Sequence, residues 1–147
     1  MDIMRMESGF LHWGHDISPE ENQYQSGLKF TISNKKQFDF IGKDALSRIK
    51  EKKIDRIFAM FTLKNNKPGM PLMLHDEPIY LKDKIVGRTT SGCYSFNYNK
   101  SLAFGYINSG LSSEEIDKEA FEIEIEKKKY QASVITRPLN DKKLNSL

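Results

Sequence analysis

The stretch AFEIEIEK, residues 120–127, alternates apolar and acidic side chains along its length. Phe121, Ile123 and Ile125 fall on one side of an extended chain and the glutamates fall on the other, because successive side chains of a β-strand point to opposite faces. One face buried and one face solvated is typical of a strand in an antiparallel sheet. The pattern therefore indicates a fold rich in β-structure.

Further strands are expected on both sides of this stretch. Residues 130–136 follow it after a short lysine-rich turn, and Lys82-Asp83-Lys84 marks a second hairpin turn. The other strand-like runs are residues 56–63, 77–81, 85–87, 92–98 and 101–107. Six or so strands within about 90 residues predict a small barrel or sandwich.

The first part of the chain, up to about residue 53, has a mixed pattern. A short helix face is expected near its start, a helix-start signal at residues 18–21, a strand at 28–32 and a helix at 42–49. The residues behind these expectations are Ile3, Met4, Met6 and Phe10 for the first face, Ser18, Pro19 and Glu21 for the start signal, and Ala45, Leu46 and Ile49 for the later helix. Gly9 and Gly14 interrupt the first helix pattern.

The composition is that of a folded domain and excludes several classes of protein. The chain has 147 residues, of which 38% are hydrophobic and 29% are charged, and its net charge is only +3. The basic residues are scattered among acids, which argues against a nucleic-acid partner. No stretch approaches the ~18 apolar residues of a membrane span. Cys93 is the only cysteine, so a reducing compartment is expected, and we take it to be the cytoplasm.

Three runs of the sequence are informative together: RMESGFLHWGHD at 5–16, DFIGKDAL at 39–46, and GRTTSG at 87–92 with KSLAFGYI at 100–107. In their order and spacing they resemble the glycine cleavage T-protein (aminomethyltransferase) family. The first run is more similar to the folate-binding tail of sarcosine and dimethylglycine dehydrogenases than to the glycine-cleavage members. The second resembles the family's Asp-Phe-Ile-Gly-Arg-Glu-Ala-Leu element, and the third resembles its Gly-x-Val-Thr-Ser-Gly and Lys-Ser-Ile-Ala-Leu-Gly-Tyr-Val strands.

The resemblance implies an α+β, mostly β architecture in two parts. Residues 1–53 would be a carboxy-terminal fragment of the family's folate-binding domain, and residues 54–147 its carboxy-terminal, six-stranded Greek-key β-barrel. The implied cofactor is tetrahydrofolate, shared with a half that this chain lacks. The glycines at 42, 87, 92 and 105 are interpreted as turn and close-approach residues, because no glycine-rich loop opens a helix here.

Arg5 and Glu7 are candidates for the folate side of the site. Their structural role would be to orient a helix of the folate domain through a partly buried ion pair, since buried charges are normally paired. In the functional alternative one of them touches the polar edge of the pterin, for which a carboxylate that accepts ring N–H groups is suited. Arg56 is the third candidate, either paired with an acid across the domain interface or in contact with the folate glutamate tail.

A possible metal site and a possible reactive cysteine are both interpreted as structural. His12, His15 and Asp16 resemble part of a metal cluster, but Gly14 makes a regular helix doubtful and no fourth ligand is evident. Trp13 and these histidines are instead expected to pack at a domain junction. Cys93 has no base or cation near it in sequence that would activate a thiolate, so a small buried strand residue is expected. We assign no catalytic and no metal-binding residue to this chain.

The resemblance also implies that catalysis lies elsewhere. The family's catalytic Asp belongs to an amino-terminal half, and the dehydrogenase members carry an FAD domain; neither pattern is present in this sequence. We therefore expect the carboxy-terminal portion of an enzyme for one-carbon transfer from a methylamine-type substrate to folate, inactive alone. A truncated gene, a split enzyme or a separately encoded subunit would produce it, with an amino-terminal half, an FAD-containing subunit or a second copy as partner. The alternative is a non-catalytic module that binds folate or a protein.

Overall fold

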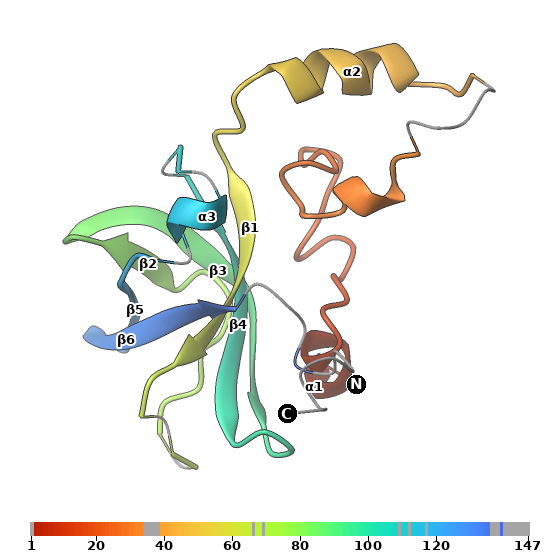
Figure 1. Cartoon of the computed structure of the whole chain (residues 1–147). Helices are drawn as coiled ribbons and strands as arrows, with labels where there is room; N and C mark the ends of the chain where they lie inside the picture. Colours follow the sequence, from red (N-terminus) through yellow and green to blue (C-terminus); the bar gives the residue numbers. More distant parts are fainter. Residues whose placement is uncertain are drawn as a thin grey trace.

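The alternating stretch of residues 120–127 becomes strand β5 (Phe121–Ile125), one of six antiparallel strands that close into a barrel (Figure 1). The structure, a computed structural model, describes residues 2–33, 39–65, 67–68, 70–108, 110–111, 113–116, 118–135 and 139. The other strands are β1 (Ile57–Leu63), β2 (Pro78–Leu81), β3 (Lys84–Ser95), β4 (Lys100–Ile107) and β6 (Lys128–Ile135). The prediction of a mostly β fold is confirmed.

The strand order is that of a Greek key. Around the barrel the order is β1-β4-β3-β2-β5-β6, and β6 pairs back to β1. Strands β2, β3 and β4 follow one another as hairpins, while β1 reaches its place beside β4 through a long connection. Closure leaves no strand edge unpaired, which removes the usual site of edge-to-edge aggregation.

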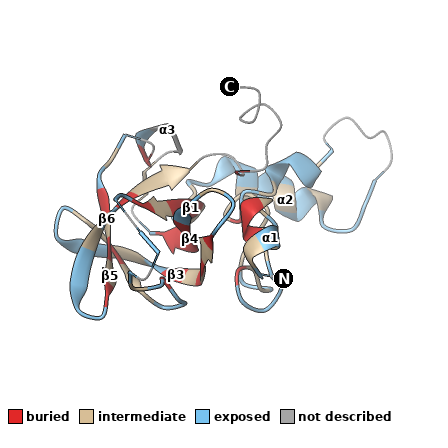
Figure 2. Ribbon diagram, turned by 90° about the horizontal axis from the view of Figure 1, so that it is seen from below, coloured by how far each residue is buried: buried red, intermediate tan, exposed pale blue. Residues whose placement is uncertain are grey.

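The apolar face of β5 forms the centre of the barrel core. Phe121, Ile123 and Ile125 are buried, and the Phe121 ring meets the Phe61 ring of β1 edge to face with centroids 5.9 Å apart. Ile116, from the short helix α3 (Ser113–Ile116), belongs to the same core cluster. Figure 2 shows that buried residues gather on the strands and on α1, whereas α2 is exposed or half-buried.

Two tight turns set the register of the hairpins. Lys82 and Asp83 between β2 and β3, and Glu126 and Lys127 between β5 and β6, all have positive φ between 49° and 62°. Two consecutive residues of this kind define a two-residue hairpin loop whose twist matches that of the strands. The predicted turn at residues 82–84 is confirmed.

Strand β3 is longer than the sequence pattern predicts. The run expected at residues 85–87 and the first part of the run expected at 92–98 belong to one strand of 12 residues that ends at Ser95, with a register shift between Thr89 and Ser91; residues 96–98 lie in the turn that follows. The linking residues are hydroxylated rather than apolar, yet Thr89 and Ser91 are buried. They are buried because other segments cover them and satisfy their hydroxyl groups, which periodicity cannot reveal.

The segment before the barrel lies along one side of it (Figure 1). It contains α1 (Asp2–Glu7), which packs against β3 and β4, the 3₁₀ turn η1 (Lys29–Thr31) and α2 (Lys43–Glu51), which stands apart from the strands. The helix predicted at residues 42–49 is confirmed, although no residue of α2 is buried. The helices of the described residues are all too short or too polar to cross a bilayer.

Two expectations for this segment are wrong. The strand predicted at residues 28–32 is absent and η1 takes its place, because the Thr31 hydroxyl and amide bond back to the Leu28 carbonyl. The start signal at Ser18 and Glu21 makes its hydrogen bonds around a brief turn, as expected. Helix α1 ends at Glu7, so Phe10 lies beyond the predicted helix face and is exposed.

Candidate functional site

The carboxylate of Asp16 is the centre of a buried polar network between the N-terminal segment and the barrel. Arg5 Nη1 donates to Asp16 Oδ2 at 2.7 Å, and the His12 amide donates to the same oxygen at 2.8 Å. The hydroxyl groups of Thr90 and Ser91 donate to Asp16 Oδ1 at 2.6 and 2.7 Å. Arg5 Nη2 in turn donates to the Ser91 hydroxyl at 3.0 Å. Four donors therefore hold a carboxylate that has no solvent exposure.

Glu7 makes a second, separate connection to the barrel. Its carboxylate accepts from the Ser95 hydroxyl at 2.5 Å and from the Asn97 side-chain amide at 3.2 and 3.3 Å. The partly buried ion pair expected in this region is present, but it joins Arg5 to Asp16, and the partners of Glu7 are neutral groups. Arg5 and Glu7 thus point to β3 and its following turn, where they fix α1 against the barrel.

Arg56 lies just before β1 and pairs with an acid of the N-terminal segment, as one sequence interpretation proposes. Its Nη1 lies 2.7 Å from Glu21 Oε1, and its guanidinium stacks over the Tyr106 ring at 4.2 Å. Burial opposes ionisation of Glu21, but hydrogen bonds from the Ser18 hydroxyl and amide and the charge of Arg56 outweigh it, so the pKa of this carboxyl lies below its ordinary value. The pair is therefore charged at neutral pH.

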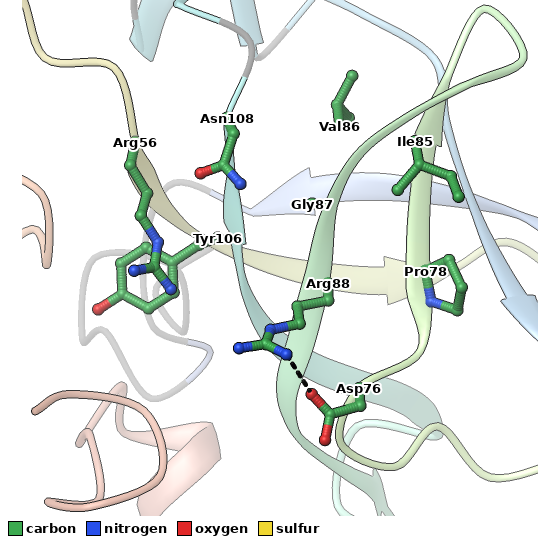
Figure 3. A pocket seen from close by; sticks show the side chains of 9 residues that line it. All are labelled: Arg56, Asp76, Pro78, Ile85, Val86, Gly87, Arg88, Tyr106 and Asn108. Atoms are coloured by element: carbon green, nitrogen blue, oxygen red, sulfur yellow. Dashed lines mark ion pairs between the residues drawn. The ribbon is translucent and has the colours of Figure 1, made fainter.

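A recess opens beside Arg56 on the outer face of β1, β4 and β3. Figure 3 shows the Arg56 guanidinium over Tyr106 and Arg88 directed at Asp76, with Asn108 also lining the recess. The recess has a volume of about 530 Å³, and its apolar wall comes from Pro78, Ile85 and Val86. We call it the arginine recess.

A larger apolar groove separates the N-terminal segment from β1 and β6. It has a volume of about 1020 Å³. Its aromatic lining comes from Phe10, Trp13, Phe30 and Phe58, with Gln23, Ser26 and Lys29 among its few polar groups. We call it the aromatic groove. Large apolar hollows with a few polar groups are typical of small-molecule and partner sites.

Trp13 does not have the predicted packing. Its side chain is 65% exposed and lines the aromatic groove instead of being buried at a junction. The turn of residues 12–17 explains this, because it directs the Asp16 carboxylate inward and leaves the neighbouring side chains outside. The rings of His12 and His15 stack on the surface with centroids 4.7 Å apart. Within the described residues no group of three metal-ligating side chains forms.

Cys93 is a buried strand residue, as predicted. Burial, together with the nearby charge of Glu7, raises the pKa of its thiol to about 11. The thiol is therefore protonated at neutral pH, and a protonated buried thiol is a poor nucleophile.

The close approaches predicted for the glycines are confirmed. A side chain at Gly87 would meet the Tyr106 carbonyl, one at Gly105 the Arg88 carbonyl, and one at Gly92 the Met73 carbonyl, all within 2.7 Å. Gly42 has a φ of +91°, which few other residues adopt at low cost.

The comparisons with known proteins agree with this fold. A family model described as "Glycine cleavage T-protein C-terminal barrel domain" matches residues 56–141. Human mitochondrial dimethylglycine dehydrogenase is 37% identical over 95% of this chain and 15% of its own length. The aminomethyltransferase of Listeria innocua is 33% identical over 93% of this chain and 36% of its own length.

A solved structure has the same fold. The crystal structure of the glycine cleavage system aminomethyltransferase T from Bartonella henselae superposes with a TM-score of 0.78 at 20% identity, over 94% of this chain and 37% of that one. The chain therefore spans little more than a third of the aminomethyltransferases that it matches, and less than a sixth of the dehydrogenase.

Proposed function

Because the chain belongs to the glycine cleavage T-protein family through its carboxy-terminal barrel domain, we propose that it is the carboxy-terminal portion of a tetrahydrofolate-dependent enzyme. The candidates are an aminomethyltransferase and a sarcosine or dimethylglycine dehydrogenase, which would pass a one-carbon unit from a methylamine-type substrate to folate. The catalytic groups, and FAD in the dehydrogenase case, would come from another part of the assembly. Residues 1–53 would complete its folate-binding domain, and residues 54–147 would be the barrel domain.

The aromatic groove is the observation that carries this proposal. It lies between the N-terminal segment and the barrel, its lining is mostly apolar, and it exposes the rings of Phe10, Trp13 and Phe30. Flat aromatic ligands such as a pterin or an aminobenzoyl ring gain stability by stacking on such rings. Because these rings are exposed to solvent, a second body could close over the ligand and exclude water from it.

Arg5, Glu7 and Arg56 have different parts in this proposal. Arg5 and Glu7 give their hydrogen bonds to Asp16, Ser91 and Ser95, and so act as positioning residues for the chain that forms the groove wall from Gly9 to Trp13. Arg56 donates from Nη1 to Glu21, and its Nη2 would donate to a carboxylate of the folate tail.

Titration calorimetry with tetrahydrofolate tests the proposal. The titrations are made on this chain alone and on its mixture with a fragment of the Listeria innocua aminomethyltransferase that lacks the matching 36% of its length. We expect weak binding by the chain alone and at least about tenfold tighter binding by the mixture, since the second body completes the site. Affinity that is unchanged on mixing would overturn the proposal.

Matched aromatic variants locate the binding site. Trp13→Ser, in the aromatic groove, should abolish most of the gain on mixing. Phe96→Ser removes a ring of similar exposure, 69% against 65%, from a turn outside the groove and should leave the gain intact. Equal losses in both variants would place the effect outside the groove.

The exposed rings of the groove also favour a second candidate, a non-catalytic module that binds folate, a protein or a second copy of itself. Contiguous exposed apolar surface usually marks an interaction site. Tight tetrahydrofolate binding by the chain alone would favour the folate module. A dimer in sedimentation equilibrium that Trp13→Ser dissociates would favour self-association. We also propose a reducing, cytoplasmic location, which the single cysteine of the sequence supports.

A further inference from the structure

The arginine recess is separate from the aromatic groove, and nothing in the proposed function so far requires Arg88. Strand β4 lies between β1 and β3, so Arg56 and Arg88 stand on either side of it. Arg88 is in register with Tyr106, while Arg56 precedes Ile57, which pairs with Ile107. Neighbouring strands are about 4.8 Å apart and a strand rises about 3.4 Å per residue, so two strand spacings and an offset of two residues separate the Cα atoms of the two arginines by roughly 12 Å. Both guanidinium groups border one hollow (Figure 3).

Each of these arginines keeps donors for a ligand. Arg56 is held in place by Tyr106 and Glu21, but among the described residues no partner is found for its Nη2. Arg88 is 68% exposed, and its pairing with Asp76 is long, at 3.2 Å, between two exposed groups. Exposed pairs of this kind contribute little, so a ligand can replace Asp76. The Asn108 side chain, also exposed, has no partner within the described ranges.

We propose that the arginine recess binds a flexible dicarboxylate, with one carboxylate on Arg56 and Asn108 and the other on Arg88. Once released from Asp76, Arg88 can receive a carboxylate through two parallel hydrogen bonds, whereas Arg56 offers Nη2 and Asn108 offers its side-chain amide. The spacing of the two arginines suits two carboxylates joined by a short chain, and Ile85 and Val86 provide apolar surface for its methylene groups. A compact anion such as phosphate is too short to reach both arginines at once, so it would engage only one of them.

Two sources share this chemistry. One is a free dicarboxylate; the other is the glutamyl tail of folate, and only that second source rests on the proposed function. The arginine recess, with a volume of about 530 Å³, is larger than one small dicarboxylate and has room for a glutamyl chain.

Backbone amide NMR of the whole chain titrated with glutarate tests the proposal. The expected result is saturable shifts at Gly87, Arg88 and Asn108, with acetate and inorganic phosphate at least about tenfold weaker because each engages only one arginine. Absence of saturable shifts with glutarate, or tighter binding of phosphate, would overturn the proposal.

An arginine variant inside the recess is compared with a lysine variant outside it, which serves as the matched control. Arg88→Gln should weaken glutarate binding about tenfold. Lys84→Gln removes an exposed cation from the same strand outside the recess and should have no effect. Arg88 is exposed, so its replacement is not expected to affect folding. Equal losses of glutarate affinity in the two variants would indicate non-specific electrostatic attraction and would overturn the proposal.

Competition separates the two sources and keeps this proposal distinct from the proposed function. If the folate tail occupies the recess, tetrahydrofolate displaces glutarate in the mixture with the Listeria innocua fragment. If both bind together, the recess takes a free dicarboxylate. Glutarate binding without any folate binding would contradict only the proposed function. Folate binding without glutarate binding would contradict only the proposal that the arginine recess binds a dicarboxylate.

Discussion

At the scale of single residues, Asp16 is the group on which the junction between the N-terminal segment and the barrel depends. Its carboxylate is fully buried and holds the Arg5 guanidinium, while its backbone carbonyl accepts a hydrogen bond from the Tyr106 hydroxyl at 2.8 Å. Loss of one partner from such a cluster leaves the others desolvated and unpaired, which is costly.

Asp16→Asn should destabilise the chain by about 3 kcal/mol, because it leaves the Arg5 charge without its buried counterion. Urea unfolding followed by circular dichroism measures this. Asp2→Asn is the matched control, since Asp2 pairs with the same arginine at 2.9 Å but is 75% exposed; its loss should cost much less stability than the loss of Asp16. Similar losses for both variants would contradict the assignment of Asp16 as the central residue.

Glu21 should give the chain an acid-sensitive component of stability. Its pKa is lowered from the ordinary 4.5, so the folded state favours the charged form, and the resulting stability is present above pH 4.5 and is lost as the pH falls through the folded pKa. Glu21→Gln should therefore cost about 1–2 kcal/mol at pH 7 and progressively less below pH 4.5.

Urea unfolding of Glu21→Gln at pH 7 and pH 3.5 checks this sign. Glu20→Gln changes an exposed neighbour and should show no such difference between the two pH values. A deficit in Glu21→Gln that grows on acidification would contradict the assignment.

At the scale of elements, the strands could be predicted wherever one face is apolar and the other polar. The pattern at Phe121–Ile125 gives its strand correctly, and the turn at residues 82–84 is signalled by polar residues between two apolar runs. The same rule fails at residues 28–32, where Phe30 is 79% exposed and, among the described residues, no strand pairs with the segment. Alternation specifies a strand only when a partner strand is available, and periodicity alone does not show the partner.

Gly92→Ala should destabilise the barrel by about 3 kcal/mol or more, because a Cβ there would lie 1.9 Å from the Met73 carbonyl oxygen. The loop that follows β1 crosses β3 at this point, so backbone would have to move. Gly42→Ala is the control: its φ of +91° is strained for alanine, but nothing lies within 4 Å. It should cost only about 1 kcal/mol, again measured by urea unfolding. A smaller loss at Gly92 than at Gly42 would show that the loop adapts.

At the scale of the whole molecule, the sequence predicts the parts of the site better than their arrangement. Arg5 and Arg56 were identified as residues of the junction, and the pairing of Arg56 with an acid is confirmed. The central role of Asp16 was missed, because its hydroxyl partners are 74 and 75 residues away along the chain. Burial of a short polar side chain by a distant segment leaves no local periodic signal.

Trp13 allows occupancy of the aromatic groove to be followed directly. It is the only tryptophan of the chain, it is 65% exposed, and it lines the groove. The free chain should therefore emit at long wavelength and be quenched readily by acrylamide. When the Listeria innocua fragment is added, the emission should move to shorter wavelength and quenching should fall, because docking removes water from the indole.

The full-length Listeria innocua aminomethyltransferase is the control for this measurement, since its own carboxy-terminal region should already occupy the position that this chain would take. It should leave the emission of the chain unchanged. If the Trp13 emission shifts with the fragment and not with the full-length protein, the aromatic groove is the surface against which the rest of the folate-binding fold docks. A shift that instead follows the concentration of the chain alone would assign the groove to a second copy, because self-association depends on concentration and docking to the fragment does not require it.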